Sequence, residues 1–530
     1  MLVVNDAEVA NISCRKHAEG RVQGILLGRC GGAAELAQRE SPECFRDLRL
    51  DQIVAAVTAG REEYDLTSIF HAPPLRIEVV RDRQAVFRDF ENPAIAACVA
   101  SFGERMRDVR AALDQSRKFN YPLQTQRLHL DAIGEYCSAV AELSRALSYA
   151  YPRSGGLREI CRYLDGYVHS ECFQALSAET TKLQIDLGDI TYTVRINGKR
   201  IEVRRYAGER DYAAEVLETF AKFRQADVQG REFTFRSRPE MNHIEEAILD
   251  RVSRLYPETF SALARHCERH RDFQDSGIVA FDREGQFFLS WLEYLAPLKK
   301  AGLRFCYPDV SERAAAIDGI ELFDLALAHQ LVAEGGQVVV NDFDLRLPER
   351  IAVVSGANQG GKTTFARAIG QMHYLASIGC PVPGRDAHLS LVDQVLTHFE
   401  REERVQTMKG KLEESLERMC VLLQQATGRS LLIMNESFDA TTVGDAVYLN
   451  RQVLGEVMRR DLLCVCVTFL DELASLSQKT VSFVAEADPE DPSKRTFRVV
   501  KRPAGGLAHA LAVARKYRLT YEQVKDRVGS

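Results

Sequence analysis

Residues 350–370 read RIAVVSGANQGGKTTFARAIG, and this stretch decides the fold class of the chain. An apolar run leads into a glycine-rich loop, and a segment with helical periodicity follows the loop. The loop fits the pattern G-x-x-x-x-G-K-[ST], which places a phosphate-binding loop between a strand and a helix. The sequence therefore predicts a nucleotide-binding domain built around this loop.

Each residue type in the loop has a physical reason to be there. Glycines let the backbone curve tightly, so that its N–H groups can point at phosphate oxygens, and the start of the following helix adds a favourable dipole. We expect Lys362 to reach the β- and γ-phosphates of ATP and the Thr363 hydroxyl to ligate Mg²⁺. A glycine-rich turn that binds nothing is the alternative. The predicted ATP-binding residues are Gly356, Asn358, Gly360, Gly361, Lys362, Thr363 and Thr364.

A second buried run, at 431–434, ends in Asn435 and Glu436. A carboxylate one strand along from a phosphate loop can orient or deprotonate the attacking water, so Glu436 is the predicted catalytic residue. A solvated strand-end carboxylate is the alternative. In P-loop ATPases an Asp that holds magnesium usually precedes this Glu; Asn435 can still accept a hydrogen bond from a magnesium-bound water, but it brings no negative charge. Thr363 and Asn435 are the predicted Mg²⁺ residues, and we expect slow turnover.

The last third of the chain has the pattern of an α/β domain. Short apolar runs, separated by helical segments, occur at 337–342 (QVVVND), 350–356, 430–436 and 462–468 (LLCVCVT). Such runs are typical of strands that are buried on both faces of a mostly parallel sheet. The predicted fold class is therefore multidomain, with a P-loop ATPase domain that follows a helical region.

The helical region contains one β-rich excursion. Apolar residues recur at threes and fours from about 81 to 172 and again from 241 to 300. Between these segments, residues 183–206 alternate apolar and polar residues around Asn197-Gly198, which is a strong hairpin signal. A helix is expected at about 212–226 and a strand in REFTFRSR at 231–238. Helix, β-rich excursion and helix suggest an insertion carried at the end of a long helical lever.

These patterns divide the chain into five predicted parts. A strand is possible in VQGILLG at 22–28, within a weakly patterned beginning. The predicted parts are an N-terminal α/β segment at 1–70, a helical core and lever at 71–182, a β-containing clamp-like insertion at 183–240, the helical return of the lever at 241–300, and the ATPase domain at 301–530.

Composition bounds the function. The chain has 530 residues, of which 45% are hydrophobic and 27% charged, and its net charge of −6 excludes a protein that is basic overall. Any nucleic-acid surface must then be a local patch. No run of apolar residues is long enough to predict a membrane-spanning helix. Thirteen cysteines without a secretory signal predict free thiols and a cytoplasmic location.

The hairpin region is locally basic. Residues 191–240 contain 11 Lys and Arg against 8 Asp and Glu. Contacts from such residues to phosphates would give affinity without base sequence, and salt would weaken them. A solvated hairpin whose charges do little is the alternative. The predicted nucleic-acid contacts are Lys199, Arg200, Arg204 and Arg205.

Several segments resemble, in order, those of the MutS family of DNA mismatch repair ATPases, which belong to the ABC class. The six segments are GANQGGKTT at 356–364, IGCPVPG at 378–384, LVDQV at 391–395, NESFDATT at 435–442, VTFLDEL at 467–473 and AHALAVARKYRLTYEQV at 508–524. In the same order, they are similar to the family stretches written GPNMGGKST, YIGSYVPA, IDRIFTR, DEIGRGTS, ATHYFEL and SYGLAVAALAGVPKEVI. Upstream, residues 72–90 look like the start of the family's core domain.

The resemblance implies a fold and a function. It implies an ABC-type ATPase domain with a C-terminal helix-turn-helix, and a homodimer in which the second copy completes the ATP site. ATP would then act through helical levers on a clamp around branched or duplex DNA, in repair or recombination. The family's mismatch-reading domain, with its Phe-x-Glu wedge, has no counterpart here. Phe102-Gly103-Glu104 matches that tripeptide, but so short a match is expected by chance.

Four departures from the family pattern bear on turnover. Asn435 replaces the strand-end Asp, Phe469 replaces the His that senses the γ-phosphate, and Val338 stands at or near the aromatic that packs on adenine. The serine that reaches into the partner's site has only Ser415 as a poor counterpart. An alternative function is therefore a nucleotide-gated scaffold that binds ATP, hydrolyses little and recruits protein partners. A transporter ATPase is opposed by the long helical region and by the missing LSGGQ segment.

Overall fold

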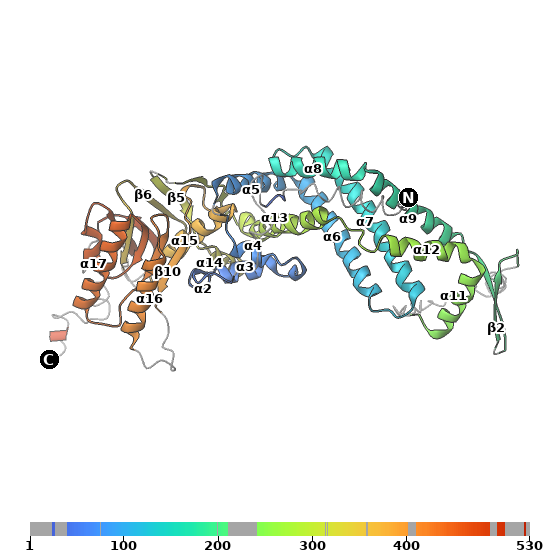
Figure 1. The fold of residues 1–530 in the computed structure, drawn as a ribbon. Helices are drawn as coiled ribbons and strands as arrows, with labels where there is room; N and C mark the ends of the chain where they lie inside the picture. Colours follow the sequence, from blue (N-terminus) through green and yellow to red (C-terminus); the bar gives the residue numbers. More distant parts are fainter. Residues whose placement is uncertain are drawn as a thin grey trace, which may run out of the picture. The chain divides into compact units, whose positions relative to one another are not determined.

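The protein is described here by a computed structural model, whose helices and strands Figure 1 labels. It describes residues 24–26, 40–74, 76–198, 200–209, 241–312, 314, 316–356, 359–400, 410–487, 495–503 and 524–525. Two compact units can be distinguished. Unit 1 takes its described residues from Ala97–Tyr151 and Cys161–Asp282, and unit 2 from Gln23–Ala96, Pro152–Ile160 and Arg283–Ser530.

Unit 1 is built from long helices, as the periodicity predicts. Prolines in the first turn of α7 and α12 fix the backbone where an N–H group would have no helical partner. Leu130, Leu183 and Leu263 are buried together, one from each of α7, α9 and α12. The helices with residues in this unit are α6 (Pro93–Ser116), α7 (Pro122–Ala150), α8 (Gly155–Val168), α9 (Glu171–Gly188), α11 (His243–Leu255), α12 (Pro257–Arg269) and α13 (Ser276–Lys300).

The hairpin predicted around Asn197-Gly198 is present in unit 1. Strands β1 (Tyr192–Asn197) and β2 (Arg200–Arg205) pair antiparallel, and Gly198 has the positive φ of 61° that such a turn needs. The β pattern expected from residue 183 is wrong for 183–188, which are the end of α9. Leu183 packs with Leu130 and Leu263 in the helical core, and this packing favours helix over strand in that segment. The helix expected at 212–226 and the strand at 231–238 lie outside the described residues.

Between Cys44 and Phe90, the described residues of unit 2 are mainly helical. They form α2 (Cys44–Leu48), α3 (Leu50–Thr58), η3 (Glu62–Tyr64), α4 (Thr67–His71) and α5 (Ile77–Phe90). The strand expected in 22–28 is wrong for Ile25 and Leu26, which lie in a turn. The Leu26 N–H donates to the Glu284 carboxylate (3.2 Å), and the Leu26 carbonyl accepts from Arg83 (2.6 Å), so side chains take the groups that a ladder would use.

The part of unit 2 predicted to be the ATPase domain contains a six-stranded sheet in the order β10-β11-β12-β7-β13-β14. Every neighbouring pair is parallel except β13 with β14, which confirms the predicted mostly parallel sheet. The strands are β7 (Ile351–Gly356), β10 (Val395–Phe399), β11 (Leu431–Asn435), β12 (Leu463–Val467), β13 (Thr480–Ala487) and β14 (Arg495–Lys501). In β10 and β12 every residue is buried, as expected of strands covered on both faces.

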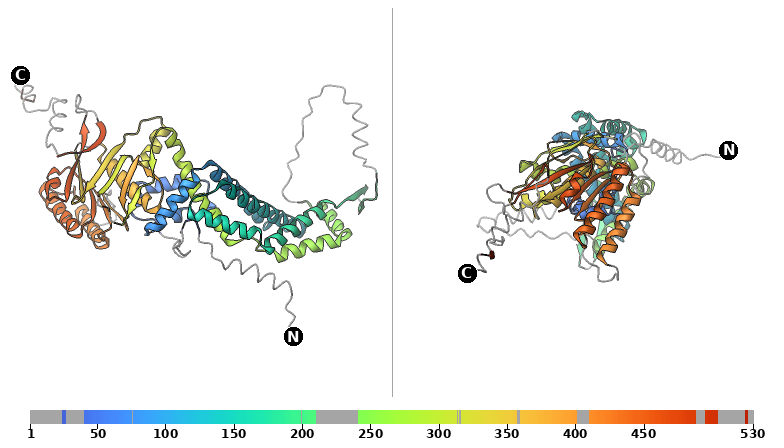
Figure 2. Two further views of the ribbon diagram at one scale, coloured as in Figure 1. Left: turned by 90° about the horizontal axis from the view of Figure 1, so that it is seen from above. Right: turned by 90° about the vertical axis from the view of Figure 1, so that its left-hand side faces the viewer.

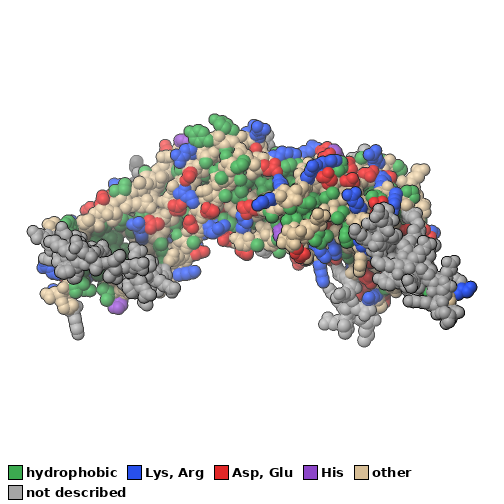
Figure 3. All heavy atoms as spheres, turned by 180° about the vertical axis from the view of Figure 1, so that it is seen from behind, with side chains coloured by type: hydrophobic (Ala, Val, Ile, Leu, Met, Phe, Trp, Pro, Cys, Tyr) green, Lys and Arg blue, Asp and Glu red, His purple; other side chains and the backbone are tan. Residues whose placement is uncertain are grey.

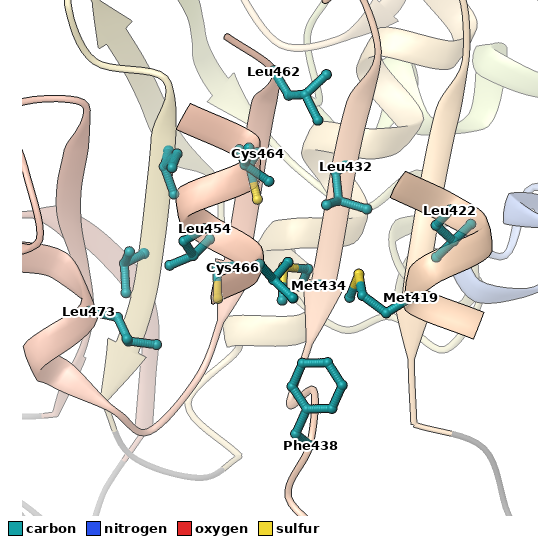
Figure 4. Close-up of a cluster of buried hydrophobic side chains, with 14 of the residues drawn as sticks. Met419, Leu422, Leu432, Met434, Phe438, Leu454, Leu462, Cys464, Cys466 and Leu473 are labelled. Atoms are coloured by element: carbon teal, nitrogen blue, oxygen red, sulfur yellow. The ribbon is translucent and has the colours of Figure 1, made fainter. Parts of the chain in front are cut away.

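Helices cover both faces of this sheet. On one face, Leu432 and Cys464 of the strands pack against Leu454 of α17 (Val443–Arg460) and Met419 of α16 (Lys411–Gln425), as Figure 4 shows. These two helices are drawn in orange in Figure 2. On the other face lies α15 (Lys362–Ile378), which contacts β11 and β12. Alternation of side chains along each strand gives each helical layer its own set of contacts.

A second sheet of four strands, β4-β9-β5-β6, accompanies the first. Its strands are β4 (Asp309–Ser311), β5 (Ala316–Leu322), β6 (Asn341–Arg346) and β9 (Asp386–Ser390). The strand expected at 337–342 begins only at Asn341, because Val339 and Val340 are each 36% exposed and make no ladder. Also in unit 2 are the short pair β3 (Phe305–Cys306) and β8 (Val382–Pro383), helix α14 (Leu325–Ala333) and η4 (Asp471–Ser475).

Two chain-wide expectations can be compared with the described residues. Their helices include none that is both long and apolar enough to cross a bilayer. Ten of their cysteines are free thiols, but Cys172 is disulfide-bonded, so the expectation of free thiols is wrong at that position.

Candidate nucleotide-binding site

The glycine-rich loop joins β7 to α15 in the way that its sequence predicts. Gly356 ends β7 with φ 111°, and a Cβ atom there would lie 2.9 Å from the Ala485 carbonyl oxygen. Gly361 caps α15 with φ 92°. Both positions therefore need glycine, the first for space and conformation and the second for conformation. Gly360 is buried in the loop, and Asn358 lies outside the described residues.

Lys362 lies at the start of α15 and is only 4% exposed. Its ammonium group donates to the Gly356 carbonyl oxygen at 2.9 Å, so the side chain folds back along the loop. Burial lowers the pKa of Lys362, while the carboxylates of Glu436, Asp439 and Asp471 act to raise it. A positive charge held this close to the loop would find a strong partner in a phosphate group.

Thr363 and Asn435 meet although 72 residues separate them. The Thr363 hydroxyl donates to the Asn435 amide oxygen at 2.8 Å. Parallel strands β7 and β11 end at the same edge of the sheet, which is why the loop and the end of β11 come together. Both side chains present oxygen atoms, the ligand type that Mg²⁺ prefers, so the donor set fits this ion. Neither oxygen is charged, so attraction to the ion would be weaker than with an Asp.

Glu436 follows Asn435 in a strained conformation. Its φ is 52°, in the left-handed region that non-glycine residues seldom adopt, and its N–H donates to the Val467 carbonyl oxygen at 2.9 Å. This bond fixes the residue between the ends of β11 and β12. Non-glycine residues in such conformations often occur at functional sites.

Asp439 is a member of the site that the sequence did not single out. Burial raises its pKa to about 6, and the nearby Glu436 and Glu400 carboxylates add to the effect, whereas Lys362 opposes it. Only its position three residues after Glu436 could have indicated it. Asp439 and Glu436 line a neighbouring pocket together, and both carboxylates act on the charge of Lys362.

A cavity of about 770 Å³ extends from the loop, a volume suited to a nucleotide. Its polar end contains Lys362, Thr363, Thr364 and Glu436, which the sequence predicted together. Its other lining residues include several apolar side chains, of which the sequence analysis had named only Val338. The remaining lining residues are Asp324, Leu327, Leu331, Gln337, Val338, Val339, Asn341, Gln359, Gly361 and Phe497.

Phe497 gives this cavity an aromatic side chain. It lies on β14 with φ 57° and is 49% exposed, and its carbonyl oxygen accepts from the Asn341 side chain at 3.2 Å. A ring held in this way can cover a nucleobase. Phe497 is far from both the loop and Val338 in the sequence. The sequence around these residues therefore could not predict that Phe497 lines the cavity.

Phe469 and Ser415 stand at two of the positions where the sequence departs from the MutS family pattern. Phe469 follows β12 and is 47% exposed. Ser415 lies in α16, where its hydroxyl is 3.3 Å from His398 Nε2. The Nδ1 atom of His398 also lies 2.8 Å from the Ser437 hydroxyl. A buried histidine therefore contacts the residue that follows Glu436. No sequence motif had pointed to His398.

The predicted nucleic-acid residues belong to the hairpin of unit 1. Arg200 and Arg204 are exposed, and Arg204 pairs with Glu202 at 2.7 Å. Arg205 donates to the Leu255 carbonyl oxygen at 3.1 Å, which ties β2 to α11. Lys199 lies outside the described residues. On the face drawn in Figure 3, basic and acidic side chains are interspersed rather than gathered by sign.

Comparison with known proteins gives a consistent result. The family described as MutS domain V matches residues 352–519. An endonuclease MutS2 from Gemmatimonas aurantiaca is 29% identical over 192 residues, which are 36% of this chain and 23% of that protein. The DNA mismatch repair protein MutS of Sorangium cellulosum is 25% identical over 505 residues, 84% of this chain and 51% of that protein. For MutS of Thermotoga petrophila the values are 24% over 246 residues, 45% and 29%.

The chain therefore spans about half or less of the length of these curated relatives. The family match begins in β7 and includes the loop, the ends of β11 and β12, and the strand that carries Phe497. It thus covers the residues that surround the cavity on the loop side, and on this match residues 352–519 are similar to domain V of the MutS family.

Proposed function

We propose that the protein is an ATP-binding MutS-family ATPase that acts on DNA in repair or recombination and hydrolyses ATP slowly. One observation carries the proposal: Lys362, Thr363 and Glu436 meet at the polar end of a cavity of about 770 Å³ that has an apolar remainder. Phosphates would lie against the loop, and the base would lie toward the apolar side chains. The relatives' names, MutS and MutS2, support DNA repair as the setting.

The roles follow from the contacts. Lys362 would exchange the Gly356 carbonyl oxygen for phosphate oxygens, which are stronger partners. Thr363 and Asn435 supply the oxygen atoms that would hold Mg²⁺, whose charge would offset that of the phosphates. Glu436 would orient or deprotonate the attacking water. Because Asn435 is neutral and Phe469 has no proton to share, hydrolysis would be slow.

The test of the site is Lys362→Ala in the full chain. Loss of the ammonium group should abolish ATP binding, measured by calorimetry or by a fluorescent ATP analogue. Lys300→Ala is the matched control, because Lys300 is an exposed lysine at the end of α13. Unchanged ATP affinity in Lys362→Ala would refute the site.

A nucleotide-gated scaffold is the second candidate, and Asn435 and Phe469 favour it. Single-turnover measurements distinguish the two functions, since a scaffold would retain bound ATP for many minutes. Asn435→Asp together with Phe469→His should raise the rate of the chemical step if these residues limit it. The same rate in the double variant would count against our account of slow turnover.

Dimerisation is part of the proposal. The resemblance to the MutS family implies that a second copy completes the ATP site. In this chain, Ser415 lies in α16 beside His398 rather than at the cavity. Light scattering should therefore show an increase in molecular mass when ATP is added, and Lys362→Ala should remove it. A mass that ATP does not change would exclude an ATP-dependent dimer.

A further inference from the structure

We propose that Glu179, His266 and His270 form a binding site for a divalent transition-metal ion of the zinc class. One ligand atom from each residue lies within 4.8 Å of the others, and all three residues belong to unit 1. Glu179 comes from α9, whereas His266 lies in α12 and His270 caps that helix. This site is separate from the nucleotide cavity and does not depend on the proposed function.

The distances match the spacing of ligands around such an ion. Glu179 Oε2 lies 3.3 Å from His266 Nδ1 and 3.7 Å from His270 Nε2. A tetrahedral ion with bonds of about 2.1 Å separates its ligand atoms by roughly 3.4 Å. Histidines four residues apart on a helix face the same side, which explains how α12 presents both rings to one point. Two imidazoles and a carboxylate form a ligand set typical of zinc.

The hydrogen bonds around the two rings leave the ligand atoms available. His266 Nε2 lies 3.0 Å from the Thr180 hydroxyl, so a proton on Nε2 can be donated there and the Nδ1 lone pair then faces Glu179. Metal-bound histidines are usually oriented in this way by a bond from the other ring nitrogen. His270 Nε2 is buried and makes no hydrogen bond. The backbone beside it is fixed by His129, whose Nε2 lies 3.1 Å from the His270 carbonyl oxygen.

The charges also suit a cation. Histidine binds a metal ion through the lone pair of its neutral ring, and the Glu179 carboxylate would supply negative charge to the ion. Arg269 is the opposing charge: its guanidinium lies 3.2 Å from Glu179 Oε2 and 3.3 Å from Oε1. Because Arg269 is 53% exposed on its side chain, it can keep Oε1 and release Oε2.

A polar cluster without metal is the competing explanation. With its proton on Nδ1, His266 would donate to Glu179 and accept from Thr180, and its own bonds would be satisfied. That arrangement still leaves the buried His270 Nε2 without a hydrogen bond, because Glu179 Oε2 is 3.7 Å away, and this is unfavourable. The 3.3 Å between His266 and Glu179 is also long for a hydrogen bond to a carboxylate. A metal ion accounts for all three ligand atoms together.

Such an ion would link two helices next to the hairpin. Helix α9 is followed by β1, and α12 is preceded by α11, which contacts β2. A metal bound between α9 and α12 would therefore fix the base from which the hairpin extends. The three protein ligands leave a fourth position for water, so exchange with chelators should be possible.

The experiment is a Zn²⁺ titration of the full chain after removal of metals with EDTA, by competition with a chromophoric zinc chelator. We expect wild-type protein to bind one Zn²⁺ more per chain than Glu179→Gln and His270→Ala, with affinity at that site at least tenfold weaker in each variant. Glu179→Gln removes a partly exposed carboxylate and keeps its shape, so this variant remains informative if His270→Ala fails to fold. His169→Ala, which removes an exposed histidine of unit 1, is the matched control.

Cobalt gives a second readout that a structural role alone would not move. Co²⁺ in a tetrahedral site absorbs visible light far more strongly than hydrated Co²⁺, and this band should be present in the wild type and in His169→Ala. It should be lost in Glu179→Gln. Equal Zn²⁺ stoichiometry and affinity in wild type and Glu179→Gln, with no difference in the Co²⁺ band, would overturn the proposal.

Discussion

At the residue scale, the carboxylates of Glu436 and Asp439 line one pocket and act on each other's charge. The pKa of Asp439 is raised to about 6, chiefly by burial and then by Glu436. The folded protein thus binds a proton at Asp439 more tightly than the unfolded chain does. Between about pH 4 and pH 6 the unfolded state holds fewer protons, so this group lowers stability as pH rises through that window.

Asp439→Asn should therefore stabilise the protein above pH 6 and have little effect near pH 4. The gain should not exceed about 1 kcal/mol, because the side chain is partly exposed and solvent screens its charge. Urea unfolding at pH 4.5, 6 and 7.5 measures it, and Asp272→Asn, an exposed residue of unit 1, is the control. A difference that is constant across this range would show that the effect is not one of ionisation.

Gly356 is the residue at which the loop depends most directly on glycine. A Cβ atom would meet backbone atoms of Ala485 at 2.9 and 3.0 Å, and the φ of 111° disfavours any other residue. Gly356→Ala should cost about 2 kcal/mol of unfolding free energy and weaken ATP binding. Gly455→Ala, at an exposed position of α17 with open space around it, should instead stabilise by about 0.5–1 kcal/mol. Equal effects in thermal unfolding would contradict this reading.

At the element scale, the sequence predicted those helices, strands and turns that depend on their own residues. The apolar run 351–355 and the loop predicted β7 and α15, and Asn197-Gly198 predicted the β1–β2 turn, because each depends on its own residues. Strand β13 was not predicted, and its pairing with β7 joins residues far apart in the chain; β14 then pairs with β13 as the next strand. For the same reason Phe497 and Asp324 of the cavity gave no sign in the sequence.

Helix α11 shows an element whose beginning is set by two side chains. Asn242 accepts from the N–H groups of Ile244 and Glu245, and Glu245 bonds back to the Asn242 N–H at 2.8 Å. Asn242→Ala should therefore cost about 1 kcal/mol in local helix stability. Hydrogen exchange in the first turn of α11 should become about fivefold faster. His243→Ala, next to the cap but outside the capping box, should leave exchange unchanged, and equal acceleration in both variants would contradict the capping role.

At the scale of the whole molecule, three of the described passages between the units lie within helices, whereas the passage at Tyr151–Pro152 lies between α7 and α8. Helices α6, α8 and α13 each contribute residues to both units. These three helices are therefore continuous from the unit that contains the proposed nucleotide site to the unit that contains the hairpin. The order of segments predicts a lever with an insertion, which stays a prediction, and the structure has helices before and after the β1–β2 hairpin. The sequence pattern could not fix where the lever begins, because helices α6 and α8 run across the division between units.

The DNA binding that we propose can be tested at the scale of the whole molecule. Arg200 and Arg204 are exposed on the hairpin, so each could contact a phosphate. If both do, removing them in Arg200→Ala/Arg204→Ala should weaken binding to duplex and junction DNA alike. It should also reduce the slope of log affinity against log salt by up to about 2, because each lost phosphate contact removes about 0.9 from that slope. Arg346→Ala, an exposed arginine of unit 2, is the control.

The same variants connect binding to hydrolysis. ATPase rates should be measured with a panel of DNA junctions at low and moderate salt, since stimulation by one structure would identify the preferred partner. In Arg200→Ala/Arg204→Ala that stimulation should fall while the rate without DNA stays the same, because the hairpin and the nucleotide cavity belong to different units. Stimulation by no DNA structure would favour the scaffold, and stimulation that survives in the variant would place the DNA contact elsewhere in the chain.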